Sequence, residues 1–343
     1  MNGAARVRGV SAATLIAAAA GLVASTALSA CSDDTACSEA KALSSSTALA
    51  ASAPLAPDSL RLIAVGDTGE GNLAQALVAR MMDEKCGAAG GCDAVIMTGD
   101  NFYEDGVEAL TDVQFLTKFE EPYALPHLAN DRNGADLPFY VVLGNHDLRS
   151  DWRPQVAYTT LPIGDEMGMR KSARWTMPDR WYDVRLRHVH LFAFDSTEYA
   201  EPDQAPEMRA KVAASDAPWK ISFSHHPRYT SGAHYFDNPE LGNAGMYALQ
   251  QAVYCGTDLF ISGHDHDTEF IDAGRDPNCP DTHFMVTGAG SKVRASPAPR
   301  DAKSVYFDDQ TEAFAYLEIT EQRMHVEFVD MCGNTRFTRD ITR

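Results

Sequence analysis

Five short polar motifs follow apolar runs along the chain, and their side chains are of types that bind metal ions. Carboxylate, carboxamide, imidazole and phenolate groups on loops at strand ends can together hold two metal ions. Such a pair of ions can clamp and hydrolyse a phosphoester. We therefore predict a metal-dependent phosphoesterase from the motifs Gly66-Asp67-Thr68-Gly69, Gly99-Asp100-Asn101-Phe102-Tyr103, Gly144-Asn145-His146-Asp147, Ser224-His225-His226-Pro227 and Gly263-His264-Asp265-His266.

Repeated strand and helix patterns precede and separate the first three motifs. The run 62–65 ends at Gly66 and indicates a buried strand, and Asn72 is a plausible cap for a helix after it. The runs 94–97 and 139–143 indicate further strands, and a helix between them is indicated by Val113, Leu116 and Phe119. Alternating units of this kind predict parallel strands.

The second half of the chain continues with short apolar runs. Residues 191–194, 221–223 and 259–262 indicate strands, and the last two lead straight into motifs. The alternating segments 315–319 and 324–328 predict an antiparallel hairpin. We therefore predict an α/β fold of two packed mixed β-sheets flanked by helices, an αββα sandwich, with the motif loops at one sheet edge.

The first 57 residues differ in composition from the rest. Residues 1–30 have the layout of a secretory leader, with two arginines before a long uncharged stretch, and the end of this stretch resembles a bacterial lipoprotein signal in which Cys31 is lipidated. An uncleaved membrane helix is the alternative. Residues 31–57 read as a flexible spacer rich in Ala, Ser and Pro, and residues 58–343 as one metallophosphatase domain. We expect a protein outside the cytoplasm whose only membrane contact is a lipid anchor at Cys31.

The net charge limits the classes of binding partner, and the cysteines indicate which disulfides could form. The formal net charge of −19 at pH 7 argues against nucleic acid as a partner, but bound metal ions still allow a small phosphorylated substrate. We expect a monomer.

In an oxidising compartment Cys86 and Cys92 are the preferred disulfide pair, because they bracket a short glycine-rich loop. The pairing of the remaining cysteines stays open: Cys37, Cys255, Cys279 and Cys332 allow three connectivities.

The ordered motifs carry a resemblance to a known family. The set resembles the calcineurin-like metallophosphoesterases, and Tyr103 within Gly-Asp-Asn-Phe-Tyr is similar to the purple acid phosphatases. The resemblance covers about residues 60 to 343. Further segments look like the small, mammalian-type tartrate-resistant acid phosphatases: Val141 to Asp147, Ala173 to Tyr182, Thr287 to Gly290 and Ala313 to Leu317.

This resemblance implies a binuclear centre of Fe(III) and a divalent Fe, Zn or Mn ion. Carried over by position, one set of ligands holds the iron, the other set holds the divalent ion, and Asp100 bridges the two. A phenolate and carboxylates favour Fe(III), whereas two imidazoles and an amide oxygen suit a divalent ion. The implied iron ligands are Asp67, Asp100, Tyr103 and His266, and those of the second metal are Asn145, His225 and His264.

The resemblance also implies catalytic residues. His146 would contact the substrate, and Asp147 would orient His146. His234, nine residues after His225, would be the general acid. His226 stands where relatives carry Tyr, so a supporting or pocket-wall role is favoured over ligation. The segments around Thr68 and Ser291 depart from the family pattern, whereas the implied metal ligands match it. We therefore expect the pocket wall, more than the ligand set, to differ from that of the family.

The implied function is an exported acid phosphatase that hydrolyses phosphate monoesters with a hydroxide activated by the Fe(III) and divalent centre. One alternative is a phosphodiesterase or nucleotidase with two divalent ions. Most such relatives lack a tyrosine at the position of Tyr103, so this residue discriminates between the two. A non-enzymatic alternative is a surface lipoprotein whose metal site supports folding or partner binding.

Overall fold

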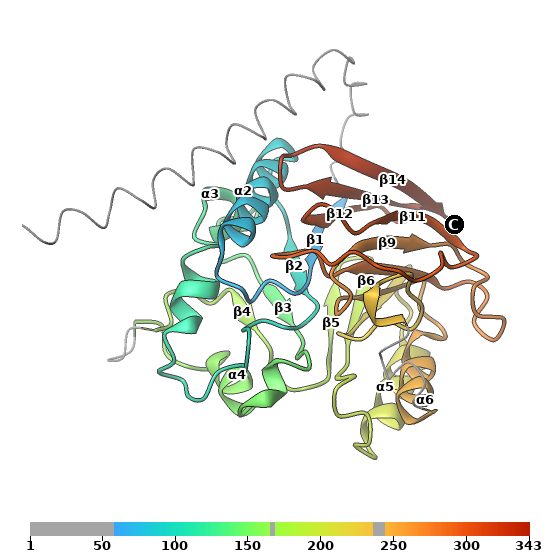
Figure 1. Cartoon of the computed structure of the whole chain (residues 1–343), viewed down its shortest axis with the longest axis horizontal. Coiled ribbons are helices and arrows are strands. Elements are labelled where there is room, and N and C mark those ends of the chain that lie inside the picture. Colours follow the sequence, from blue (N-terminus) through green and yellow to red (C-terminus); the bar gives the residue numbers. More distant parts are fainter. Residues whose placement is uncertain (1–57, 165–168, 236–243) are drawn as a thin grey trace, which may run out of the picture. The chain divides into compact units, whose positions relative to one another are not determined.

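Two mixed β-sheets carry the motif loops in the computed structural model, which describes residues 58–164, 169–235 and 244–343 (Figure 1). The first sheet holds seven strands, with β1, β2, β3 and β4 parallel and the C-terminal strands antiparallel to their neighbours. Its order is β14 (Thr335–Thr342), β13 (Arg323–Asp330), β12 (Ala313–Ile319), β1 (Leu60–Val65), β2 (Ala94–Met97), β3 (Phe139–Val141) and β4 (Trp175–Thr176).

The second sheet also has seven strands and is mixed. Strands β6, β7, β8 and β10 run parallel, while β5, β9 and β11 are antiparallel to their neighbours. Its order is β11 (Ser304–Asp308), β9 (Thr268–Ile271), β10 (His283–Thr287), β8 (Leu259–Ser262), β7 (Trp219–Phe223), β6 (Val189–Ala193) and β5 (Tyr182–Leu186). The predicted pair of packed mixed sheets is confirmed.

A continuous apolar core joins the inner faces of the two sheets. Ile63 of β1 and Ile261 of β8 belong to the same buried cluster. A second cluster lies on the outer face of the second sheet, where Met208 of α5 (Gln204–Ala214) and Val253 of α6 (Ala244–Tyr254) pack with Phe260. Helix α2 (Leu73–Ala88) contacts β12 and β13 of the first sheet. Helices therefore flank both sheets, as the sequence predicted.

Within each sheet, the motif loops gather at one edge because the strands before them are parallel. Strands β1, β2 and β3 end directly before or within two residues of the first three motifs, and β7 and β8 end directly before the last two. The carboxyl ends of parallel strands share one sheet edge. Asn72 caps α2 as predicted, since its side chain accepts a hydrogen bond of 2.9 Å from the backbone N–H of Gln75.

A helix is present where Val113, Leu116 and Phe119 predicted one, but it is a π-helical turn. It spans Phe115–Glu120, so it includes Leu116 and Phe119, while Val113 precedes it and is exposed. Tertiary packing decides this, because the rings of Phe115 and Phe119 lie against Trp175 at 5.8 and 4.9 Å between centroids. The short segments Pro126–Ala129 (α3) and Arg153–Tyr158 (α4) complete the helices around the first sheet.

The predicted disulfide between Cys86 and Cys92 is confirmed, with 5.1 Å between their Cα atoms. A second disulfide joins Cys255 and Cys279. Cys37 lies outside the described residues, as do the predicted leader, lipidation site and spacer. Within the described ranges, no helix has the length and hydropathy needed to cross a membrane.

Candidate metal centre

Three donor atoms from three motifs converge where the divalent ion is predicted. Oδ1 of Asn145 lies 3.0 Å from Nε2 of His225 and 3.0 Å from Nδ1 of His264, and the two nitrogens lie 3.1 Å apart. Ligands about 2.1 Å from one ion in octahedral geometry lie about 3.0 Å from one another. The three atoms are therefore spaced as ligands of one ion would be, and this donor set fits a divalent metal.

A second group of donors lies where the iron is predicted. The phenol oxygen of Tyr103 lies 2.9 Å from Oδ1 of Asp67 and 3.2 Å from Nε2 of His266. Nε2 of His266 lies 3.5 Å from Oδ1 of Asp67. This set combines a phenol, a carboxylate and an imidazole, the mixture that suits a hard trivalent ion.

Asp100 lies between the two groups. Its Oδ1 is 3.5 Å from Nε2 of His225, and its carboxylate groups with Asp67 and His266 within 4.8 Å. The structure thus brings together all seven residues predicted as ligands. Asp100 is only 1% exposed, so its carboxylate charge is removed from solvent. Two metal ions bound on either side of it would compensate this buried charge.

Three of these residues adopt backbone conformations that side chains rarely take. The φ angles of Asp67, Asp100 and His264 are 56°, 51° and 69°. Left-handed conformations of non-glycine residues are strained and cluster at functional sites. Gly144 shows how tightly the loops approach, because a Cβ atom there would lie 2.2 Å from Oδ1 of Asp100. The motif glycines therefore make room for the carboxylate.

Surrounding groups fix the protonation of the ligands. Nδ1 of His225 donates to the carbonyl oxygen of Thr98 at 2.9 Å, which leaves Nε2 to face the donor group. Burial, reinforced by neighbouring imidazoles, lowers the pKa of His264 well below its usual value, so this ring is neutral as a ligand must be. Burial and the charges of Asp67 and Asp100 raise the pKa of Tyr103 well above 10, so a phenolate there calls for a bound cation.

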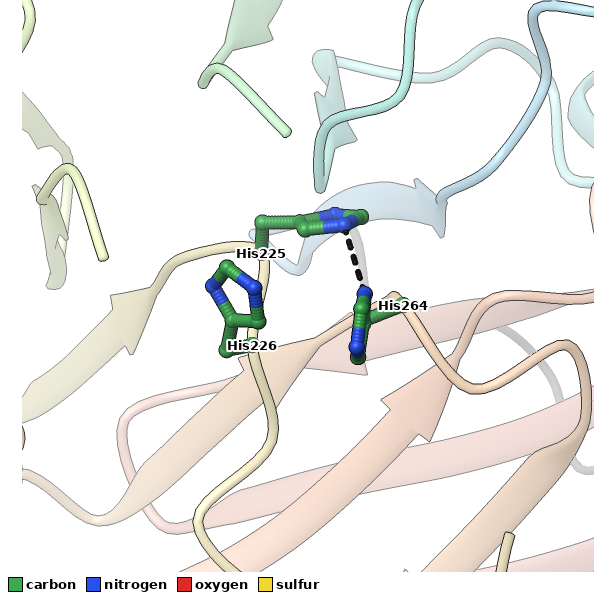
Figure 2. Close-up of side chains that lie close together, drawn as sticks. All are labelled: His225, His226 and His264. Atoms are coloured by element: carbon green, nitrogen blue, oxygen red, sulfur yellow. Dashed lines mark hydrogen bonds between the residues drawn. The ribbon is translucent and has the colours of Figure 1, made fainter. Parts of the chain in front are cut away.

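His226 lies beside the divalent-ion group. Figure 2 shows its ring with those of His225 and His264, and the donor atoms of the three lie within 4.8 Å of one another. Nδ1 of His226 contacts Oγ of Ser196 at 3.0 Å, while its buried Nε2 has no hydrogen-bond partner in the described part of the chain. Its predicted supporting role stays a prediction.

His146 and Asp147 are neighbours in the chain, but their side chains bind different partners. Nδ1 of His146 donates to the carbonyl oxygen of Glu104 at 2.6 Å, and its Nε2 accepts from Arg149 at 3.1 Å. The carboxylate of Asp147 accepts from the backbone N–H of Gly144 at 2.8 Å and from the backbone and side chain of Asn101. Asp147 thus ties the second motif to the third, and the side chain of Asn101 holds the loop of the second motif in place.

His234 lies over the divalent side of the centre. Its ring centroid is 4.3 Å from that of His264, and its backbone N–H donates to Oδ1 of Asp265 at 2.8 Å. Nε2 of His234 accepts from Arg294 at 2.7 Å. Arginine can only donate, so the ring proton lies on Nδ1. Asp265 also accepts from Thr230 at 2.6 Å and anchors the loop that carries His234.

Three cations beside the centre were not found from the sequence. Arg149 and Arg294 contact the two predicted catalytic histidines, and Lys292 places Nζ 3.4 Å from the centre of the Tyr103 ring. Lys292 lies in the segment that departs from the family pattern, and this departure is a signal that could have drawn attention to it. Arg294 follows that segment by two residues and gave no signal of its own. Arg149 follows the third motif by two residues and gave no separate signal.

Comparisons with known proteins agree with this geometry. A family model described as calcineurin-like phosphoesterase matches residues 60–268. Purple acid phosphatase 17 of Arabidopsis thaliana is 30% identical over 302 residues, which cover 80% of this chain and 82% of that protein. The chain belongs to the purple acid phosphatases, within the calcineurin-like phosphoesterases. Membership confirms the predicted enzyme class, a metallophosphoesterase of the acid phosphatase type, and implies a binuclear metal centre.

Other relatives show how far the similarity extends. Tartrate-resistant acid phosphatase type 5 of Homo sapiens is 26% identical, with 84% of this chain and 92% of that protein covered. The solved structure of GAP50, described as the anchor in the inner membrane complex of Plasmodium, has a TM-score of 0.65 at 22% identity and covers 83% of this chain and 89% of that one. The latter shows the shared fold alone.

Proposed function

We propose that this purple acid phosphatase is an exported enzyme that hydrolyses phosphate monoesters with an Fe(III) ion and a divalent ion. The observation that carries the proposal is the pair of donor groups joined by Asp100, one of which contains the phenol of Tyr103. A phenol among carboxylates favours Fe(III) over a second divalent ion.

The residues assigned to each ion follow from the two groups. Asp67, Tyr103 and His266 would hold the iron, and Asp100 would reach both ions. The divalent ion, of Fe, Zn or Mn, would be held by Asn145, His225 and His264. Bound there, the two ions would supply a nucleophilic hydroxide below neutral pH and neutralise the charge of the phosphate.

The chain's own residues complete the reaction. When a hydroxide oxygen bonds to phosphorus, the bond from phosphorus to the ester oxygen breaks and its electron pair stays on that oxygen. His234 in its protonated, imidazolium form would donate the proton on Nδ1 to this oxygen and become neutral. His146, whose ring is held by Glu104 and Arg149, would contact the substrate. Asp147 would act by holding the motif loops together.

Metal analysis with paired substrates tests this proposal. The purified enzyme should contain iron and turn over aryl and alkyl phosphate monoesters at acid pH much faster than the matching diesters. Two divalent ions with faster diester turnover would favour the phosphodiesterase alternative. Stoichiometric metal without turnover of any phosphoester would favour the non-enzymatic surface lipoprotein.

We also propose that the enzyme works outside the cytoplasm as a monomer, anchored through Cys31 to a membrane, on small phosphorylated substrates and not on nucleic acid. The leader pattern of residues 1–30 and the net charge of −19 support this. Membrane fractions from cells that express the wild type should hold the enzyme. The Cys31→Ser variant should move to the soluble extracytoplasmic fraction, and retention in the membrane would contradict a lipid anchor.

A further inference from the structure

A cavity of about 380 Å³ lies beside the segment of chain that joins β7 to α6. This volume falls within the range of about 300 to 1,000 Å³ that is typical of small-molecule sites. None of the residues that line the cavity belongs to the two donor groups of the metal centre. The lining residues are Arg228, Tyr229, Thr230, Tyr235, Arg275 and Asp301.

The cavity lies on the outer side of the second sheet. The ring of Tyr229 packs against Phe284 with 4.9 Å between centroids, and Phe284 belongs to the apolar cluster on the outer face of this sheet. Arg275 lies in the segment between β9 and β10, which leaves β9 at the sheet edge opposite the motif loops. The cavity is therefore a second site, apart from the metal centre.

The guanidinium of Arg228 is held by aromatic rings and keeps its donors for a ligand. Its central carbon lies 3.9 Å from the centre of the Tyr247 ring and 4.5 Å from that of Tyr229. Stacking of this kind fixes the plane of the group without using its N–H donors. The Nε atom of Arg228 is buried, yet it has no hydrogen-bond partner in the described part of the chain. A buried donor without a partner is rare in folded proteins and calls for an explanation, such as a bound ligand.

Arg275 brings a second cation to the same place. Its guanidinium carbon lies 4.0 Å from the centre of the Tyr229 ring, so both arginines stand against this one ring. Asp301 is the carboxylate of the lining, and it accepts a hydrogen bond from Nε of Arg275. Within residues 58–164, 169–235 and 244–343, no carboxylate oxygen lies within 4.0 Å of the guanidinium of Arg228, whereas Arg275 is paired. The cavity is therefore positive in a chain whose net charge is −19.

We propose that this cavity is a binding site for a small organic phosphate, whose phosphate group is held by Arg228 and Arg275. Planar guanidinium forks match the oxygens of a phosphate bidentately. The volume of the cavity also leaves room for an organic body beside the phosphate, and the ring of Tyr235, which is 43% exposed, offers this body an aromatic surface. The ligand is bound and not hydrolysed here, because no metal ligand lines the cavity.

Calorimetric titration of the metal-loaded enzyme with phenylphosphonate tests the proposal. This probe carries a phosphate-like group on an aromatic body and has no ester bond to hydrolyse. The wild type should bind two molecules per chain, one at the metal centre and one in the cavity. Arg228→Gln should weaken the cavity site about tenfold or more, because a charged fork is lost. Arg228→Lys keeps the charge without the fork and should fall between. Arg209→Gln is the matched control, because Arg209 is an exposed arginine of α5 on the same side of the sheet, and this variant should keep both sites.

The Asp100→Ala variant isolates the cavity site, because it should lose the metal centre. It should still bind one phenylphosphonate with wild-type affinity, and adding Arg228→Gln should weaken this binding about tenfold or more. Thermal unfolding without ligand checks that each variant is folded. Inorganic phosphate should bind the Arg228-dependent site about tenfold more weakly than phenylphosphonate, because it lacks the organic body.

Three results would overturn the proposal: binding that does not depend on Arg228, a folded Asp100→Ala variant that binds no phenylphosphonate, or equal affinities for the two probes. Binding in the cavity does not require turnover. An enzyme that hydrolyses no phosphoester but binds phenylphosphonate through Arg228 would therefore refute the phosphatase function and support this site.

Discussion

The ammonium group of Lys292 lies 3.4 Å from the centre of the Tyr103 ring. Its charge also pairs with Glu70, whose Oε1 is 2.6 Å from Nζ. A cation over the face of an aromatic ring attracts the electrons of that ring. Because Tyr103 is the proposed phenolate ligand of Fe(III), Lys292 should influence how readily this ligand donates electrons to the iron.

The first prediction is therefore a shift in colour. Replacing Lys292 by Met removes the cation and raises the energy of the phenolate electrons, so the visible charge-transfer band should move to longer wavelength. The visible spectrum of the iron-loaded variant measures this. Lys303→Met, which alters an exposed lysine before β11, is the control and should leave the band in place. A band that does not move in Lys292→Met would contradict an electronic effect of this contact.

The second prediction concerns the proposed bridging ligand. Asp100→Ala should lose both metal and turnover, because it removes the carboxylate that reaches both donor groups. Metal-to-protein ratios and phenyl phosphate turnover report the two losses. Asp216→Ala removes an acid that is 87% exposed and serves as the control. An Asp100→Ala enzyme with full activity would show that this carboxylate does not bridge.

The third prediction concerns the general acid. His234→Ala should slow alkyl phosphates, whose leaving groups need a proton, by about 10²-fold or more, and slow activated aryl phosphates much less. Rates across a series of leaving groups of different pKa measure the difference. A uniform loss across the series would remove the acid role. A thermal unfolding curve like that of wild type would confirm that the variant is folded.

The fourth prediction concerns stability against pH, at a site on β13 away from the metal centre. Burial alone would raise the pKa of Glu327, but hydrogen bonds from His325 and Lys85 lower it to about 2. The unfolded value is near 4.5, so the stabilisation is complete above that pH and is lost as pH falls towards 2. The hydrogen bond from Glu327 raises the pKa of His325, so the stabilisation from His325 is complete below 6.5 and is lost as pH rises through the raised value.

Both groups therefore stabilise the fold fully between about pH 4.5 and 6.5. Glu327→Gln should cost about 1–2 kcal/mol of unfolding free energy at pH 5.5, and this cost should shrink near pH 2. Urea unfolding of the variant and wild type at both pH values measures the difference. A cost that is the same at the two pH values would mean that the ionised carboxylate contributes nothing.

Local patterns in the sequence were enough to predict the motifs at the strand ends, the cap at Asn72 and the disulfide between Cys86 and Cys92. Each of these depends on residues that are close together in the chain. The helix predicted around Leu116 forms, but as a π-helical turn that begins after Val113, where Phe115 and Phe119 pack against the distant Trp175. Contacts made across the chain, as between Arg294 and His234, cannot be read from spacing alone.

The ligands were predictable as a set because strand ends bring them to one edge. The hydrogen bonds that hold these ligands and their loops in place were not predictable. Nδ1 of His225 is bonded to the carbonyl of Thr98, which is 127 residues away in the sequence. Asp147 is predicted to orient His146, and its carboxylate accepts hydrogen bonds from Gly144 and Asn101. Short side chains that bond backbone N–H groups give no periodic signal, so their partners emerge only with the fold.

The visible spectrum of the purified domain, read together with its iron content, tests the central claim most directly. With one iron per chain, the wild type should show a charge-transfer band in the visible range, and Tyr103→Phe should keep most of the iron and lose the band. A colourless wild type with stoichiometric iron and an intact Tyr103 would contradict the proposed Fe(III) centre.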